Sequence, residues 1–96
     1  MLKNYYVYIL KCTDKSYYIG VTNNMQRRLS QHINKSLPNC YTFNRLPVEL
    51  VWQGVFNDIR VVISFGKKIK RWSRKKKEAL IKNDWESLSF FLTIQN

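Results

Sequence analysis

Runs of Tyr, Val, Ile and Leu predict three β-strands in this chain. The runs cover residues 5–11, 17–21 and 48–56. β-Branched and aromatic residues at this density are typical of strands. The polar residues 13–16 favour a turn, so we expect the first two strands to form a hairpin. If its loop has an odd number of residues, Tyr8 and Tyr18 lie on the same face of the hairpin.

Apolar residues at helical spacing predict helices between and after the strands. These helices cover residues 25–35, 58–72 and 73–83. The residues that precede or begin them are Ser, Thr, Asn and Asp, which cap helix N-termini: residues 22–24, Asp58 and Ser73. Beyond the last helix, the same spacing predicts a tail that packs on the core through Trp85, Leu88, Phe91 and Leu92.

The first predicted helix has an apolar stripe and a polar pair. Met25, Leu29 and Ile33 recur every four residues, so we expect them to form its buried face. Arg28 and His32 are also four residues apart, on the flank of that stripe. Both can therefore point toward the edge of the sheet that the helix covers.

The charge of the chain is strongly positive. Its 96 residues are the size of one domain, residues 1–96, and 17 Lys and Arg against six Asp and Glu leave a formal net charge of +11. Such an excess predicts a polyanionic partner, which is DNA, RNA or an anionic membrane surface. A solvated basic face that keeps a small protein soluble is the alternative.

The positive charge is concentrated at residues 67–77, where eight of eleven residues are cationic. Phosphates neutralised by such side chains release counterions, which makes binding strong and sensitive to salt. Trp72 within this run either stacks on an exposed base or packs on the core. The residues predicted to contact nucleic acid are Lys67, Lys68, Lys70, Arg71, Arg74, Lys75 and Lys76.

Membrane and zinc-binding roles have little support. No apolar run approaches the ~20 residues that a membrane span needs, and the run at residues 5–11 is too short for a signal peptide. Cys12 and Cys40 lack the CxxC spacing, and two Cys and one His are too few for a structural zinc site. We expect reduced thiols in a cytoplasmic protein.

Four polar residues of the first half form a candidate site for chemistry on a phosphodiester. These are Tyr8, Tyr18, Arg28 and His32. An arginine binds phosphate oxygens through its forked guanidinium group, and a tyrosine or histidine can relay a proton from an attacking water. Each of the four also has a purely structural explanation, as a strand aromatic, a surface charge or a contact at a helix end.

These residues lie in motifs that resemble the GIY-YIG nuclease domain. "YVY" at residues 6–8 and "YIG" at residues 18–20 resemble its paired motif, with Tyr6 in place of the first glycine. "GVTNNMQRRLSQH" resembles the helix with an arginine and a histidine that follows in the family. "IKRWSRKKKEALI" resembles the C-terminal half of small standalone bacterial members, so the resemblance covers nearly the whole chain.

The resemblance implies an α+β fold, a three-stranded antiparallel β-sheet flanked by helices, and cleavage of DNA with one divalent metal, Mg²⁺ or Mn²⁺. It implies that Tyr8 and Tyr18 line the catalytic site and help to activate water. Arg28 matches the arginine that stabilises phosphate charge, and His32 matches the histidine. Asn83 is a weak counterpart of a later family asparagine.

Gly66 stands where the resemblance implies the metal-binding glutamate. Family members have a sequence similar to R-E-K-Q-I-K-x-W there, whereas this chain has "FGKKIKRW". No acidic residue lies within one helical turn of Gly66, and a hard divalent cation needs oxygen ligands. We therefore expect no metal ligand at this position, unless the alignment is shifted or a partner chain supplies one.

Three functions remain open on the sequence. The first is a GIY-YIG endonuclease that cuts DNA, with branched or damaged DNA among its candidate substrates, despite the missing glutamate. The second is a catalytically inactive nucleic-acid-binding module on the nuclease fold. A remote third is a basic domain that binds RNA or a membrane surface.

Overall fold

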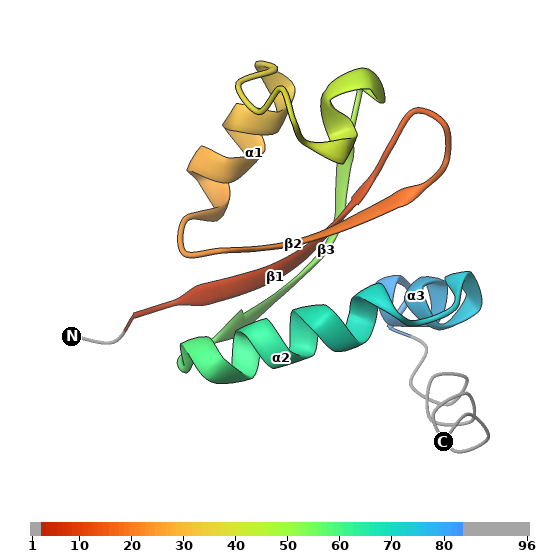
Figure 1. Ribbon diagram of the computed structural model, residues 1–96. Coiled ribbons are helices and arrows are strands. Elements are labelled where there is room, and N and C mark those ends of the chain that lie inside the picture. The colour runs from red at the N-terminus through yellow and green to blue at the C-terminus, as the bar shows by residue number, and fades with distance from the viewer. Residues whose placement is uncertain (1–2, 84–96) are drawn as a thin grey trace.

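Three antiparallel strands form the sheet of the computed structural model, which describes residues 3–83 (Figure 1). The strands are β1 (Tyr5–Lys11), β2 (Tyr17–Thr22) and β3 (Glu49–Phe56). Their order in the sheet is β2-β1-β3, so β1 is central and β2 is an edge strand. This architecture confirms the expected α+β fold and the hairpin of the first two strands.

The helices begin at the caps that the sequence predicts. They are α1 (Met25–Ile33), the short 3₁₀ helix η1 (Tyr41–Asn44), α2 (Ile59–Lys70) and α3 (Arg74–Ile81). Asn24, Asp58 and Ser73 each accept a hydrogen bond from a backbone N–H of the following first turn. Asn83 follows α3 with φ of 55°, a left-handed conformation that Asn tolerates at a helix end. The tail predicted to pack on the core lies outside the described residues.

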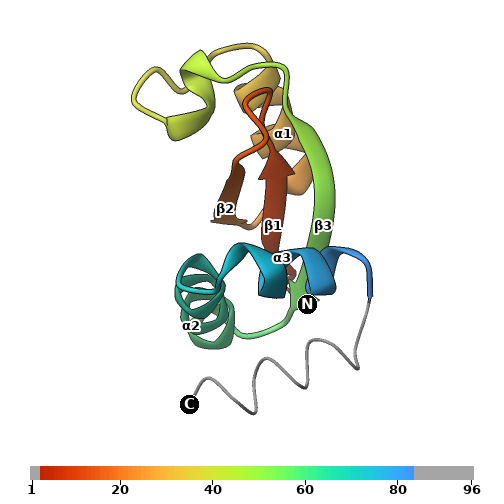
Figure 2. The same ribbon diagram turned by 90° about the vertical axis from the view of Figure 1, so that its right-hand side faces the viewer.

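The two faces of the sheet are covered by different helices. α1 lies on one face, and α2 and α3 lie on the other (Figures 1 and 2). Since side chains alternate along a strand, Val7 and Ile9 of β1 join the core beneath α2 and α3, whereas Tyr8 and Leu10 point toward α1. All four side chains are fully buried. The hydrophobic core comprises Val7, Ile9, Ile19, Val62, Ile69, Ala79 and Leu80.

The register of the hairpin places the two predicted site tyrosines on one face. Tyr8 pairs with Gly20, and Leu10 pairs with Tyr18, so Tyr8 and Tyr18 are diagonal neighbours on the side of α1. A β-carbon at Gly20 would collide with the ring of Tyr8. Gly20 therefore makes the room that the Tyr8 ring occupies.

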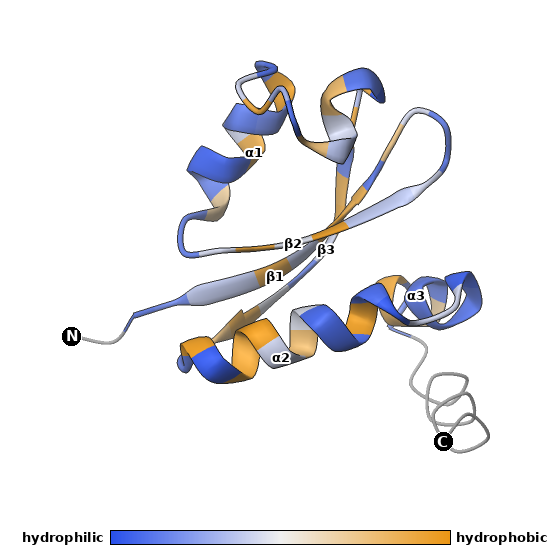
Figure 3. Ribbon diagram, in the orientation of Figure 1, coloured by the Kyte–Doolittle hydropathy of each residue, from blue (hydrophilic) through white to orange (hydrophobic). Residues whose placement is uncertain are grey.

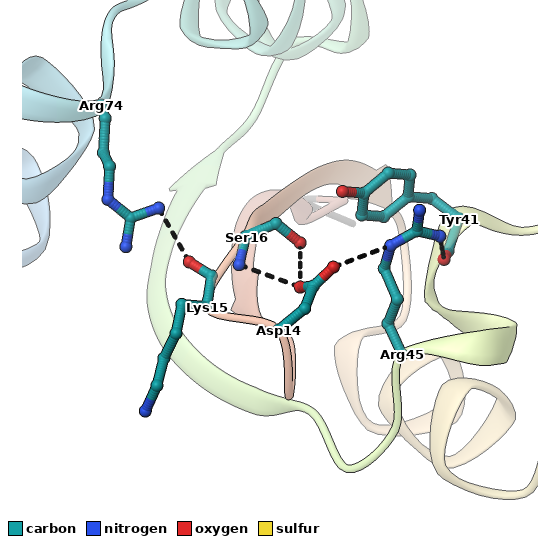
Figure 4. Close-up of polar contacts among 6 residues, drawn as sticks. All are labelled: Asp14, Lys15, Ser16, Tyr41, Arg45 and Arg74. Atoms are coloured by element: carbon teal, nitrogen blue, oxygen red, sulfur yellow. Dashed lines mark hydrogen bonds and ion pairs between the residues drawn. The ribbon is translucent and has the colours of Figure 1, made fainter.

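Two arginines hold the tip of the hairpin (Figure 4). Arg45, which follows η1, donates from Nε to Oδ2 of Asp14 at 3.1 Å. Arg74, the first residue of α3, donates from Nη1 to the carbonyl oxygen of Lys15 at 2.8 Å, and its guanidinium lies 4.5 Å from the centre of the Tyr17 ring. The tip is thus tied to structure on both sides of the sheet.

The prediction for the buried face of α1 is wrong. Ile33 is 55% exposed, and Met25 and Leu29 are only half-buried, whereas His32 is 1% exposed. The sheet face beneath α1 presents the hydroxyl of Tyr8, which needs a polar partner when buried. α1 therefore turns its polar flank inward, and Figure 3 shows that this helix is largely hydrophilic.

Gly66 lies where α2 packs tightly against the sheet. The residue is buried, and a β-carbon there would lie 2.8 Å from Cγ2 of Val21 and 4.0 Å from Cγ2 of Val7. A contact of 2.8 Å is too short for two carbon atoms. The glycine in the middle of α2 thus has a packing role, because a larger residue would collide with Val21.

We predict that Gly66→Ala destabilises the protein although alanine favours a helix. The gain in helix propensity is about 1 kcal/mol, whereas overpacking against Val21 costs about 1–3 kcal/mol. Urea unfolding of the variant should give a lower free energy of unfolding than the wild type.

Ser64→Ala, at an exposed position of the same helix, is the matched control and should change stability by no more than about 0.5 kcal/mol. Val21→Ala should relieve the collision, so that the double variant shows a favourable coupling of about 1 kcal/mol. A Gly66→Ala protein as stable as Ser64→Ala would contradict the close contact.

Candidate nucleic-acid site

A buried hydrogen-bonded chain lies between the sheet and α1. The hydroxyl of Tyr8 lies 2.9 Å from Nε2 of His32, and Nδ1 of His32 lies 2.7 Å from Oγ1 of Thr42 in η1. All three side chains are at most 1% exposed. The three elements β1, α1 and η1 are therefore joined at His32, which is the only buried residue of α1.

Two further tyrosines extend this cluster toward the surface. The ring of Tyr18 lies 6.2 Å from that of Tyr8 and 5.4 Å from that of His32, measured between centroids. On its other side, Tyr41 stacks on Tyr18 at 6.3 Å with 16° between the ring planes. The guanidinium of Arg45 lies 3.7 Å from the centre of the Tyr41 ring, which remains 43% exposed.

Arg28 brings a positive charge to the same cluster. It precedes His32 by one turn of α1, and its Nε donates to Oε1 of Gln31 at 3.1 Å. Its positive charge acts on the hydroxyl of Tyr8, whose pKa burial raises and Arg28 partly lowers, and with Tyr18 and residues 36–40 it lines one hollow. The structure therefore brings the four predicted residues, Tyr8, Tyr18, Arg28 and His32, to one place.

The surroundings keep the two phenols of this cluster protonated and its imidazole neutral. Burial raises the pKa of Tyr8, and the charge of Arg28 offsets part of that effect. Burial and a hydrogen bond to Cys40 raise the pKa of Tyr18. Burial, aided by the charge of Arg28, lowers the pKa of His32. At neutral pH the site thus holds two phenols beside a neutral imidazole, with one fixed cation.

Three residues of the cluster were missed by the sequence analysis. Thr42, Cys40 and Tyr41 come from η1 and the residue before it, which showed only a local aromatic character. Cys40 lies 3.9 Å from Nδ1 of His32 and accepts from the hydroxyl of Thr42 at 3.6 Å. No periodicity marks such a turn, because its residues meet the site through tertiary packing alone.

Hollows along the edge strand β2 connect the cluster to the cationic residues. Arg28 and Tyr18 line the hollow that residues 36–40 also line, and Tyr18 and Tyr41 line the next one with Lys70 and Lys77. In the other direction, Arg28 also lines a hollow at the end of β2. Phenol, guanidinium and ammonium groups therefore follow one another beside this strand.

The cationic residues predicted to contact nucleic acid differ in their exposure to solvent. Those that are exposed are Lys67, Lys68, Lys70, Arg71, Arg74 and Lys75. Arg74 is engaged with the hairpin tip, as described above. Lys76 is only 5% exposed, so its position does not favour contact with a ligand. Lys77, which was not predicted, is half-buried beside β2, and burial lowers its pKa.

Trp72 packs on the core rather than standing free for stacking. It is half-buried against the hydrophobic core, with its ring 6.3 Å from that of Phe65 at an angle of 79°. Of the two explanations that the sequence left open, the structure supports core packing.

The donor groups near Gly66 do not fit a hard divalent cation. Val21 faces Gly66, and Val21 and Ile63 line the hollow at the end of β2 that Arg28 also lines. Within residues 3–83, no three His, Cys, Asp or Glu side chains are grouped so that they could hold a metal ion. Apolar side chains thus occupy the place where the resemblance implies a carboxylate.

The helices of residues 3–83 are all too short, or too polar, to cross a membrane.

Comparison with known proteins gives consistent matches. The GIY-YIG catalytic domain matches residues 4–79. A UPF0213 protein of Syntrophus aciditrophicus is 40% identical over 88 residues, covering 92% of this chain and 100% of that protein. A UPF0213 protein of Natronomonas pharaonis is 37% identical over 84 residues, covering 88% and 98%. The solution NMR structure of a UPF0213 protein of Bacillus halodurans, 37% identical, matches with a TM-score of 0.55 over 82% of this chain and 83% of that one.

We predict that acidification destabilises the fold through His32. Because its pKa is lowered in the folded protein, the unfolded chain binds more protons below its ordinary pKa of about 6.5. The free energy of unfolding should therefore decrease as the pH falls through that value, by at most about 1.4 kcal/mol for each pH unit. Urea unfolding at several pH values measures this slope.

His32→Gln is the control, because His32 is the only histidine of the chain. The variant should be less stable at neutral pH, and its stability should vary little in this window, since carboxyl groups titrate near pH 4. An equal slope in both proteins would contradict the assignment.

Proposed function

The chain belongs to the GIY-YIG family and is similar to small UPF0213 proteins. From this membership and the site geometry, we propose that it binds the phosphodiester backbone of DNA along β2 and cleaves it weakly or not at all. The family supports a nuclease-like function and a nucleic-acid substrate. The observation that carries the proposal is the succession of Arg28, Tyr18 and Lys70 beside one edge strand.

The charges beside β2 suit a phosphate chain. Arg28 can hold a phosphate in its fork, and Lys70 and Lys77 continue the positive potential along the strand. Lys67 of α2 and Arg71, the C-cap of this helix, are exposed and extend the positive potential further. A net charge of +11 adds long-range attraction that is independent of sequence.

The phenols and the imidazole supply proton transfer at the bound phosphate. Tyr18 is the half-buried phenol of the cluster, and it can pass a proton from an attacking water to Tyr8 once the proton of Tyr8 has moved to His32, 2.9 Å away. Arg28, whose charge acts on the Tyr8 hydroxyl, stabilises both the phenolate and the negative charge that develops on phosphate. These roles of the four residues belong to the proposal.

The weak or absent cleavage follows from the apolar environment of Gly66. GIY-YIG nucleases generally use a divalent metal, and Mg²⁺ or Mn²⁺ would need oxygen ligands. Val21 and Ile63 supply none, and residues 3–83 contain no group of three His, Cys, Asp or Glu side chains that could hold a metal ion. Charge neutralisation therefore rests on Arg28 and the lysines alone.

An active endonuclease is the second candidate. The observation that favours it is the gathering of Tyr8, Tyr18, Arg28 and His32 at one place, with a buried hydrogen bond between Tyr8 and His32. In either case we place the protein in the cytoplasm, where the free thiols of Cys12 and Cys40 are stable.

We predict that DNA binding is steeply salt-dependent and weakened by Lys67→Ala/Lys70→Ala. Loss of two phosphate contacts should lower the slope of log affinity against log salt by about 1.8. Fluorescence anisotropy with a labelled duplex and a labelled four-way junction, in the presence of a chelator, measures the slope and any preference for branched DNA.

Arg60→Ala/Lys82→Ala is the matched control. It also removes two charges, at exposed positions away from β2, and should leave the slope close to the wild-type value. Equal losses in both double variants would show that binding follows net charge rather than this strand edge.

We predict that Gly66→Glu combined with Val21→Ala raises Mg²⁺-dependent nicking of plasmid DNA by at least about tenfold. The smaller side chain at position 21 makes room for the carboxylate, whereas Gly66→Glu alone collides with Val21. Gly66→Gln/Val21→Ala, of the same size but without the charge, is the control and should stay at the wild-type rate.

The same assay decides between the two candidates. Robust wild-type nicking that is lost in Tyr18→Phe would establish the active endonuclease and overturn our first proposal. Wild-type nicking at the level of the no-protein control, with binding intact, supports it.

A further inference from the structure

We propose that Thr42 is a positioning residue that fixes the tautomer of His32, so that the imidazole carries its proton on Nδ1 and accepts the proton of Tyr8 on Nε2. This inference deepens the proposed function, because it concerns the same site. It is tested below without DNA or metal, so that the two can fail separately.

A neutral imidazole has one N–H, and His32 has two buried neighbours. One arrangement has the hydroxyl of Tyr8 donating to Nε2, while the Nδ1–H group donates to Thr42. The reverse arrangement has Thr42 donating to Nδ1, while the Nε2–H group donates to Tyr8. Only the first lets His32 take the proton of Tyr8.

The sulfur of Cys40 selects between these arrangements, because donors converge on it. The hydroxyl of Thr42 donates to Sγ at 3.6 Å. Hydrogen bonding by the backbone N–H groups of Thr42 and Tyr41 and by the hydroxyl of Tyr18 also lowers the pKa of this thiol. Although burial raises the pKa of Cys40, these hydrogen bonds outweigh burial and lower it overall. The sulfur is therefore an acceptor of hydrogen bonds.

The contact with Cys40 fixes the direction in which the Thr42 hydroxyl donates its single proton. Once it is directed at Sγ, Oγ1 has only lone pairs to offer to His32, 2.7 Å away. Nδ1 must then carry the imidazole proton, and the lone pair of Nε2 faces Tyr8. Burial excludes water from all three groups, so no solvent molecule can substitute for Thr42.

The arrangement gives the proton of Tyr8 a defined destination. Transfer leaves a phenolate on Tyr8 and an imidazolium on His32, and both N–H groups of that imidazolium keep an acceptor, the Tyr8 oxygen and Oγ1 of Thr42. The positive charge of Arg28 acts on the phenolate oxygen. Arg28 and the two acceptors of the imidazolium stabilise the charge separation that this transfer creates.

The experiment is ¹⁵N NMR of protein labelled in its histidine ring. With one histidine in the chain, a long-range ¹H–¹⁵N spectrum contains one pair of ring nitrogens and needs no assignment by mutation. At neutral pH we expect a protonated Nδ1 and an unprotonated Nε2. A protonated Nε2 in the wild-type protein would overturn the proposal.

Thr42→Val keeps the shape of the side chain and removes its hydroxyl, so the Nδ1–H tautomer of His32 should no longer predominate. Thr42→Ser, which restores a hydroxyl at this position, should keep it and serves as the matched control. An unchanged tautomer in folded Thr42→Val would show that Thr42 is only structural. If Thr42→Val does not fold, Cys40→Ala is used in its place. Because this variant loses the sulfur acceptor, its His32 should also shift toward the Nε2–H tautomer. An unchanged spectrum of Cys40→Ala would contradict the proposal.

Discussion

The buried hydroxyl of Tyr8 is the constraint on which the site and one half of the fold depend. Tyr8 lies at the middle of the central strand and is fully buried, so its hydroxyl must find a partner inside the protein. His32 is that partner, and it in turn holds Thr42. The orientation of α1 and the position of η1 therefore follow from one polar atom on β1.

The sheet separates two kinds of packing. On the side of α2 and α3, side chains of β1 and β2 enter an apolar core, and stability comes from burial of hydrophobic surface. On the side of α1, the same strands present phenols, and stability depends on hydrogen bonds that must all be satisfied. A functional cluster can be held rigidly on the second side because the first side supplies most of the hydrophobic core.

Much of the fold could be predicted because local signals are strong. Strand composition and the caps Asn24, Asp58 and Ser73 each depend on a few neighbouring residues. The gathering of Tyr8, Tyr18, Arg28 and His32 followed from the parity of the hairpin and the one-turn spacing of α1. The buried face of α1 could not be found this way, because periodicity favoured Ile33, whereas the polar face of the sheet selects His32. Thr42 and Cys40 reach the site through a turn that carries no periodic signal.

The two explanations of Gly66 concern the same space. The β-carbon of a glutamate there would lie only 2.8 Å from Cγ2 of Val21, so position 21 and position 66 cannot both be large. Val21 therefore occupies space that a side chain at residue 66 would need, and it packs against α2 at Gly66. An apolar contact that stabilises the fold thus stands where the nuclease resemblance implies a metal ligand, and a carboxylate would fit there only with a smaller residue at position 21.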